Sequence, residues 1–191
     1  MEAVCVFCGS SDNVDNVYLV AADKMGEEMA SRGLRLVYGA GITGLMGTLA
    51  RTVLVNDGEV FGVLPKIFDT PELSMPDITQ FELVETMHLR KARMYELSDA
   101  FIAMPGGFGT MDELFETITW AQVGVHKKPI GILNTNGYYD LLIEFLDSVE
   151  RKGFAYKGHN RLFISADNPA DLLDGLNAYK TPDDLHKWLE R

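Results

Sequence analysis

Residues 99–113 read Asp99-Ala-Phe-Ile-Ala-Met-Pro-Gly-Gly-Phe-Gly-Thr-Met-Asp-Glu113. The apolar run at 100–104 is typical of a strand that is buried on both faces of a parallel sheet. Pro105 ends this strand, and the glycines after it permit a tight turn and close approach of the backbone to a ligand. We expect Thr110 to cap a helix whose first turn carries two carboxylates. Strand, turn and helix N-terminus together predict an anion-binding site.

Glu113 has two interpretations at this stage. Thr110-x-x-Glu113 matches a capping box, in which the glutamate accepts a hydrogen bond from the N–H of the capping residue. Acidic side chains in a first helical turn also interact favourably with the helix macrodipole. Glu113 is therefore either a structural cap or a carboxylate that faces a ligand, and these residues alone leave both open.

Segments typical of strands and helices alternate along the rest of the chain. The sequence predicts strands at 3–7, 34–38, 60–64, 81–84, 100–104, 129–133 and 162–164. It predicts helices at 14–31, from about 47 to 55, and at 87–97, 110–123, 137–152, 169–179 and 182–189. This alternation indicates one α/β domain over residues 1–191, with a doubly wound, mostly parallel sheet flanked by helices. Ligands in such sheets bind outside the carboxyl ends of the strands, where the glycine turns lie.

Composition narrows the function classes. The chain is 47% apolar and 24% charged, which is ordinary for a globular protein, and its net charge of −11 disfavours a nucleic-acid binder. We expect no membrane segment and no targeting signal, and therefore a cytoplasmic protein. Cys5 and Cys8 have C-x-x-C spacing without a second ligand pair, so we expect buried or loop thiols rather than a zinc site.

A second glycine-rich turn follows the second predicted strand. Residues 39–44 match G-x-G-x-x-G, so a dinucleotide site must be considered. The next strand ends in Pro65-Lys66 rather than in the acidic residue that holds a ribose, and no G-K-[ST] follows. We therefore expect Gly41 and Gly44 to serve close packing between helix and strand, with a possible ligand contact.

The segments between the two glycine turns carry charged residues near the edge of the sheet where we expect a ligand to bind. Residues 66–78 predict a loop with one helical turn that could fold over a ligand. The helix after it begins with four basic side chains, His88, Arg90, Lys91 and Arg93. Cations at a helix N-terminus oppose the macrodipole, so this face is either solvated or has anionic partners. In the second case Arg90 and Lys91 bind an anionic substrate, or Arg90 pairs with Glu113.

Two spaced motifs resemble those of the Lonely Guy (LOG) family. Residues 105–113 match its PGGxGTxxE signature and residues 87–91 match its MHxRK element. The turn at 39–47 is similar to the family's GGGxxGLMG segment, with Ala40 in place of a glycine, and the likeness extends from Val4 to about Leu176.

The resemblance implies a Rossmann-like homodimer that needs no metal or cofactor. The implied activity is hydrolysis of the N-glycosidic bond of a cytokinin riboside 5′-monophosphate, or of AMP itself, to free base and ribose 5-phosphate.

The resemblance also implies roles for individual residues. Arg90 and Glu113 fall on its catalytic positions. The expected substrate-binding set is Glu72, Arg90, Lys91, Gly106, Gly107, Phe108, Gly109, Thr110, Met111, Asp112, Glu113 and Thr119, with Gly41 and Gly44 of the second turn. We expect the phosphate on the N–H groups at 106–110. Glu113 would stabilise an oxocarbenium-like state and activate water, while Arg90 would lower the pKa of Glu113.

Two functions of other classes remain open. One is a carrier that binds a nucleotide-like cofactor without catalysis, because a fold does not determine a function. The other is an NAD(P)-dependent oxidoreductase in which Lys66 meets a 2′-phosphate. The label lysine decarboxylase, often given to this family, is disfavoured because pyridoxal chemistry needs a Schiff-base lysine beside a phosphate site, and no lysine here has that context.

Overall fold

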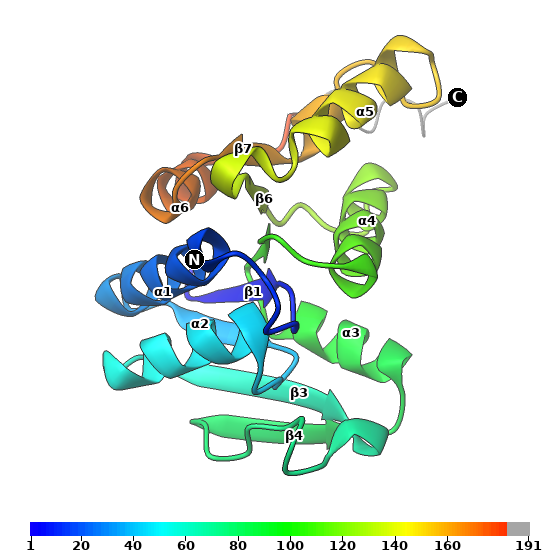
Figure 1. Ribbon diagram of the computed structural model, residues 1–191. Coiled ribbons are helices and arrows are strands. Elements are labelled where there is room, and N and C mark those ends of the chain that lie inside the picture. Colours follow the sequence, from blue (N-terminus) through cyan, green and yellow to red (C-terminus); the bar gives the residue numbers. More distant parts are fainter. Residues whose placement is uncertain (183–191) are drawn as a thin grey trace.

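The computed structural model describes residues 1–182, which form a seven-stranded parallel sheet with helices on both faces (Figure 1). The strands are β1 Ala3–Phe7, β2 Arg35–Tyr38, β3 Val60–Pro65, β4 Gln80–Val84, β5 Ala100–Ala103, β6 Ile130–Leu133 and β7 Ile164–Ala166. The α-helices are α1 Asn16–Ser31, α2 Gly44–Val55, α3 Met87–Glu96, α4 Phe108–Gln122, α5 Asp140–Arg151 and α6 Pro169–Ala178. Short 3₁₀ helices are η1 Lys66–Phe68, η2 Thr135–Gly137 and η3 His159–Leu162. The predicted α/β fold is confirmed.

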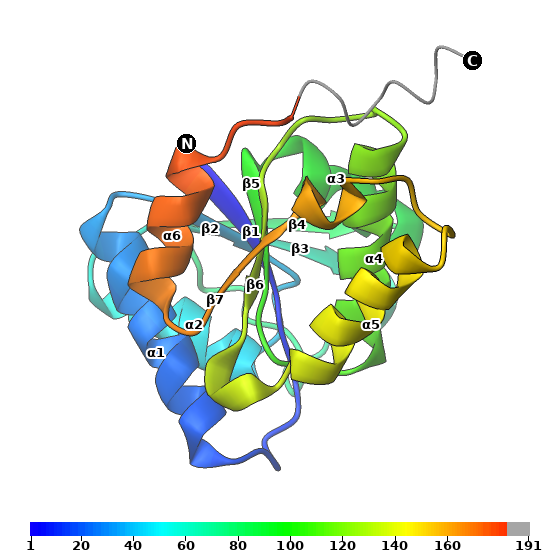
Figure 2. The same ribbon diagram turned by 90° about the horizontal axis from the view of Figure 1, so that it is seen from above.

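The sheet separates two apolar cores. Helices α1, α2 and α6 cover one face, and α3, α4 and α5 lie on the other (Figure 2). Side chains of a strand point to opposite faces in alternation, and β1 shows this directly. Val4 and Val6 pack in the core under α1 and α2, whereas Cys5 and Phe7 pack in the core under α3 and α4. All of β1 is buried, as expected for a central strand.

The strand order is β4-β3-β2-β1-β5-β6-β7, so the direction of winding reverses between β1 and β5. A ligand crevice is expected outside the carboxyl ends of the strands at such a point. The pairing of Phe7 with Ala103 brings the turn after β1 against the turn after β5. The N–H of Gly9 donates to the carbonyl of Pro105 at 3.0 Å. The stretch at 99–113 is thus placed at the switch point.

Several predicted boundaries were wrong, including the start of α2, which lies at Gly44 rather than near 47. The last strand is β7 rather than 162–164, because the chain up to Leu162 forms the 3₁₀ helix η3. Helix α5 begins at Asp140 rather than 137, because Asn136 and Gly137 have φ of +54° and +69°. Helix α1 begins at Asn16 rather than 14. The helix expected at 182–189 lies outside the described residues.

No helix within residues 1–182 is long and apolar enough to cross a membrane. Both cysteines are buried free thiols, as expected.

Candidate active site

Helix α4 begins two residues earlier than predicted. Its N-cap is Gly107, with φ −90° and ψ −154°, and Phe108 is its first helical residue. The prediction of Thr110 as the cap, and with it the capping box, was therefore wrong. Thr110 is buried in the first turn against Gly106, where an added Cβ would lie 2.2 Å from its Oγ1. Because Glu113 is free of a capping role, its carboxylate can face the crevice.

Arg90 and Glu113 form a nearly buried ion pair. Nη1 of Arg90 lies 2.7 Å from Oε1 of Glu113, and the two side chains are 11% and 10% exposed. Nε of Arg90 also donates to the carbonyl of Val63 at 3.3 Å. The guanidinium of this α3 residue therefore contacts both β3 and α4. The pairing that the sequence offered as one of two possibilities is the one observed.

Arg90 and burial act on the pKa of Glu113 in opposite directions. Burial raises the pKa of Glu113 above its ordinary value, and the charge and hydrogen bond of Arg90 oppose this rise without cancelling it. The predicted lowering contribution of Arg90 to the pKa of Glu113 is confirmed, but the net direction is upward because burial is the larger cause. Desolvation outweighs the ion pair because the carboxylate is almost removed from water.

Gly39 makes room for the guanidinium. A Cβ atom added at Gly39 would lie 1.7 Å from Nη2 of Arg90, too close for the two to coexist. The same atom would lie 3.0 Å from Cε of Met46. The first glycine of the G-x-G-x-x-G match therefore accommodates a side chain of this protein rather than a dinucleotide.

Two further basic side chains of α3, Lys91 and Arg93, have carboxylate partners. Nζ of Lys91 lies 3.0 Å from both Asp112 and Glu116 on α4. Burial alone would lower the pKa of Lys91, but the two carboxylates outweigh it and raise that pKa. Arg93 pairs with Glu82 at 2.9 Å. The ion pairs of Arg90 and Lys91 with α4 thus offset their unfavourable position near a helix N-terminus, whereas Arg93 lies in the last turn of α3, where a cation is favoured.

A pocket of about 240 Å³ opens beside the Arg90–Glu113 pair. It is lined by Cys8, Gly9, Ser10, Met46, Met87, Arg90, Gly107, Gly109, Thr110, Asp112 and Glu113. The first N–H groups of α4 have no partner within the helix, so its N-terminus presents donors beside this pocket. Six expected residues are brought together here: Arg90, Gly107, Gly109, Thr110, Asp112 and Glu113.

Sequence reasoning missed Cys8, Gly9, Ser10, Met46 and Met87. A short turn of small residues after the first strand was the only signal for three of them. Burial raises the pKa of the Cys8 thiol, and the nearby carboxylate of Glu113 raises it further. Cys8 therefore lines the pocket as a neutral thiol and does not act as a nucleophile.

The remaining expected residues do not line this pocket. They are Glu72, Lys91, Gly106, Phe108, Met111, Thr119, Gly41 and Gly44. Thr119 is exposed on α4, and its hydroxyl donates to the carbonyl of Phe115 at 2.7 Å. Glu72 is exposed in the loop after η1. A Cβ atom added at Gly44 would lie 2.6 Å from the backbone of Ser10, so Gly44 serves close packing.

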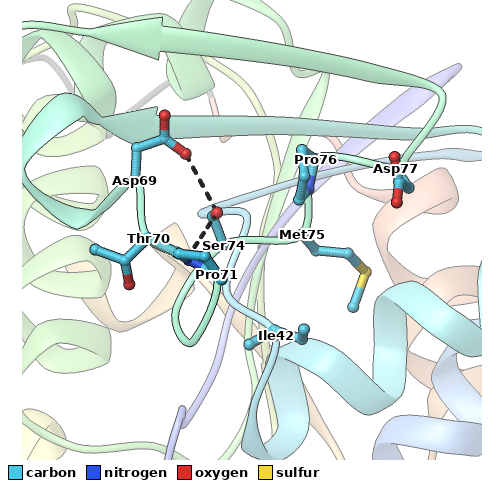
Figure 3. A pocket seen from close by; sticks show the side chains of 8 residues that line it. All are labelled: Ile42, Asp69, Thr70, Pro71, Ser74, Met75, Pro76 and Asp77. Atoms are coloured by element: carbon cyan, nitrogen blue, oxygen red, sulfur yellow. Dashed lines mark hydrogen bonds between the residues drawn. The ribbon is translucent and has the colours of Figure 1, made fainter.

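The loop after η1 forms a separate hollow of about 430 Å³ (Figure 3). Its lining residues are Ile42, Asp69, Thr70, Pro71, Ser74, Met75, Pro76 and Asp77. Two backbone hydrogen bonds tie the loop to the second glycine turn, from Ile42 to Leu73 and from Met75 to Ala40. The hollow and the pocket beside Arg90 and Glu113 have no lining residue in common.

Comparisons with known proteins identify relatives of this chain. The family model described as "Possible lysine decarboxylase" matches residues 46–176. A probable cytokinin riboside 5′-monophosphate phosphoribohydrolase of Oryza sativa subsp. japonica is 45% identical over 178 residues, which are 93% of this chain and 84% of the relative. A cytokinin riboside 5′-monophosphate phosphoribohydrolase of Arabidopsis thaliana is 43% identical over 183 residues, 96% of this chain and 80% of the relative.

Solved structures of lower identity share the fold. The molybdenum cofactor binding protein of Rippkaea orientalis superposes with a TM-score of 0.71 at 18% identity, covering 93% of this chain and 96% of its own. The molybdenum cofactor carrier protein of Chlamydomonas reinhardtii reaches 0.68 at 19% identity, covering 93% and 99%. At these identities the likeness establishes only the Rossmann-like architecture. The family model, together with the two plant relatives that match more than nine-tenths of its length, shows that the chain belongs to the LOG family.

Proposed function

We propose that this protein is a phosphoribohydrolase that cleaves the N-glycosidic bond of a cytokinin riboside 5′-monophosphate. AMP is an alternative substrate with the same scissile bond. The observation that carries the proposal is the buried Arg90–Glu113 pair, which faces a pocket beside the N-terminus of α4. The relatives named above support the substrate class.

The geometry suits each part of the reaction. The N–H groups at the start of α4 favour the 5′-phosphate, because the helix dipole and the free donors both stabilise an anion. With the phosphate there, Glu113 lies on the ribose side, where its charge would stabilise positive charge that develops at C1′. Water forms the new bond to C1′ and gives a proton to Glu113, while the base leaves with the electron pair of the C1′–N bond.

Arg90 has two tasks in this scheme. Its guanidinium holds Glu113 in one orientation, and it opposes the rise in pKa that burial imposes, so a larger fraction of Glu113 is ionised at neutral pH. Asp112 is a weaker candidate for a direct role, since its carboxylate is bound to Lys91 and is 63% exposed.

Glu113→Gln tests the proposal. Glutamine can still accept the hydrogen bond from Arg90, so the variant is expected to fold, but it cannot accept a proton. We expect the release of free base from AMP and from isopentenyl-AMP to fall by roughly 10²–10⁴-fold. Asp112→Asn is the matched control, with a loss of less than about tenfold. Full turnover by Glu113→Gln would remove Glu113 from the mechanism, and a wild-type protein that binds AMP without releasing base would instead support a carrier.

Decarboxylation of lysine is not supported by the site. A Schiff-base lysine must be available as a neutral amine. Lys91 contacts α4 and its charge acts on Glu113, yet two carboxylates raise its pKa and hold it as a cation.

We also propose a homodimer that forms through α4 and α5. Helix α5 packs Leu142 and Ile143 partly against the core but has no fully buried side chain in the structure of residues 1–182, and it exposes Leu141 and Phe145 by 81% and 58%. On the same face of the sheet, α4 exposes Phe108 and Phe115 by 96% and 37%. Exposed apolar side chains gathered on one face are typical of an interface.

The oligomeric state of charged variants tests the dimer. We expect Leu141→Asp to be a monomer by light scattering coupled to size-exclusion chromatography. Val55→Asp is the control, because Val55 is similarly exposed, at 78%, on α2 at the opposite face of the sheet. A Leu141→Asp variant with the mass of the wild type would contradict this interface. We further propose a cytoplasmic location, since both cysteines are free thiols.

A further inference from the structure

A small inner cavity borders Glu113 between α3, α4 and the sheet. It has a volume of about 10 Å³ and is lined by Phe7, Lys91, Tyr95, Phe101, Glu113, Glu116, Thr117 and Trp120. Among the described residues that line this cavity or the pocket beside Arg90, Glu113 alone lines both. A volume of this size accommodates about one water molecule. Glu113 therefore stands between the proposed reaction pocket and a space with room for a single water.

The hydroxyl of Tyr95 is a buried polar group with no hydrogen-bond partner within residues 1–182. Its ring is held on several sides. It stacks on Phe101 and meets Trp120 edge-on, with centroids 5.0 and 4.9 Å apart, and Nζ of Lys128 lies 4.4 Å from the ring centroid. Buried hydroxyls are rarely left unpaired, because folding removes their hydrogen bonds to bulk water. The hydroxyl therefore needs a partner that the described part of the chain does not supply.

Charged groups around the inner cavity have unused hydrogen-bonding capacity. Helical side chains lean toward the N-terminus of their helix, so Tyr95 extends from the last turn of α3 toward Lys91, one turn earlier. Nζ of Lys91 uses two of its three donors, on Asp112 and Glu116. Arg90 occupies Oε1 of Glu113, and Oε2 accepts no hydrogen bond within residues 1–182. A water in this cavity thus has the two to four polar partners that a buried water requires.

We propose that the inner cavity holds one ordered water that joins the hydroxyl of Tyr95 to the carboxylate of Glu113, and that Tyr95 is a positioning residue for this carboxylate. The inference rests on the proposed function for its effect on turnover. Tyr95 donates to the water, and the water donates to Oε2 while Arg90 holds Oε1. Burial raises the pKa of Tyr95 to about 12, so the phenol keeps its proton at neutral pH. Hydrogen bonds to an ionised carboxylate favour that form.

Other groups that face these two side chains also affect the ionisation of Glu113. Those that face Glu113 are Arg90 and Lys91 on α3, Asp112 on α4, Cys5 in β1 and Cys8 after it. Glu116 faces the inner cavity, and Lys128 and His126 pack against the ring of Tyr95. All of them are kept in the variants below, so a change in the pKa of Glu113 reports the tyrosine hydroxyl.

Tyr95→Phe tests the bridge, because it removes one oxygen atom and keeps the ring contacts. The carboxyl pKa of Glu113 is followed by ¹³C NMR of full-length protein labelled at glutamate, with Glu113→Gln to assign the resonance. We expect this pKa to rise by roughly 0.4–1 pH unit in Tyr95→Phe, as for the loss of one hydrogen bond to the ionised form. The acidic limb of kcat/KM for AMP should move to higher pH by the same amount.

Tyr38→Phe is the matched control. The hydroxyl of Tyr38 is also buried without a partner within residues 1–182, but its ring packs in the core on the other face of the sheet. Removing it should leave the pKa of Glu113 unchanged.

Two outcomes would overturn the bridge. An unchanged pKa of Glu113 in Tyr95→Phe, with a higher melting temperature, would mean that the hydroxyl is an unpaired group whose removal relieves a cost. Equal rises in Tyr95→Phe and Tyr38→Phe would mean a general response of the core. A wild-type protein that binds AMP without releasing adenine would reject the hydrolase, and the NMR comparison would still decide the bridge.

Discussion

The two glycine-rich turns of this protein look alike in sequence but have different roles in the structure. At the turn after β5, a Cβ atom added to Gly107 or Gly109 meets no atom within 4 Å. At the turn after β2, a Cβ atom added to Gly39 lies 1.7 Å from Arg90, and one added to Gly44 lies 2.6 Å from the backbone of the turn after β1. Beyond Gly106, which packs against Thr110, the turn after β5 is open to a ligand, and the turn after β2 is filled by the protein itself at Gly39 and Gly44.

The difference shows that a glycine motif by itself does not identify a binding site. Glycines admit close approach of any group, whether a phosphate or a guanidinium of the same chain. What distinguishes the turns is their neighbours. The turn after β5 leads into a helix N-terminus that faces the pocket, whereas the turn after β2 lies under Arg90 and against the loop after η1. The following predictions are ordered from the largest effect to the smallest.

Gly39→Ala should have the largest effect, because the new methyl group and the guanidinium of Arg90 cannot occupy the same space. We expect kcat/KM for AMP to fall by roughly 10²–10⁴-fold through displacement of Arg90 from Glu113. Steady-state kinetics on protein shown to be folded by circular dichroism would measure this. Gly33→Ala, at φ +64° with no atom within 4 Å, is the control: it should lose stability and keep its activity.

The pH dependence of kcat/KM should show how the turn after β2 acts on Glu113 through Arg90. Glu113 must be ionised to act, so activity falls as pH falls through its pKa. Because burial raises that pKa, the acidic limb of kcat/KM should lie above the ordinary glutamate value of about 4.5. In Gly39→Ala the limb should move to still higher pH, since the opposing charge of Arg90 is displaced. A limb at or below the ordinary value in wild type would contradict the assignment of burial as the dominant cause.

Gly109→Ala should have a moderate effect at the open turn. The methyl group meets no protein atom, and alanine is preferred to glycine in a helix by roughly 0.5–1 kcal/mol, so thermal stability should hold or rise. The same methyl group would crowd an anion on the N–H groups of the first turn. We therefore expect KM for AMP to rise by about tenfold with kcat changed less. A variant with unchanged KM would place the phosphate elsewhere.

Ala40→Gly should have the smallest effect. Ala40 has φ +57°, and a left-handed conformation costs alanine about 1–2 kcal/mol. Glycine removes this strain but loses one buried methyl group, worth about 0.8 kcal/mol, and about 0.4–1 kcal/mol of unfolded-state entropy. These terms nearly cancel, so urea unfolding should show a change in unfolding free energy within about 1 kcal/mol. A larger change would mean that the turn after β2 rearranges.

Part of the site could be predicted from local sequence, and part could not. The glycines, Asp112 and Glu113 follow one strand directly, so their place at its carboxyl end needs only the strand–turn–helix pattern. The first residue of α4 could not be predicted from local sequence. Thr110 is the better capping residue by preference, but it packs against Gly106 as the third residue of the helix. Tertiary contact overrode the local preference.

The sequence by itself determined the class of fold, because buried strands and amphipathic helices alternate with short turns whatever their neighbours are. It also determined which residue types could do the chemistry. Only the tertiary structure decided which of them meet. The order of the strands sets the turn after β1 against the turn after β5 and brings Gly39 under Arg90. Contacts between residues so far apart in the chain depend on the order of strands in the sheet, which local patterns do not encode.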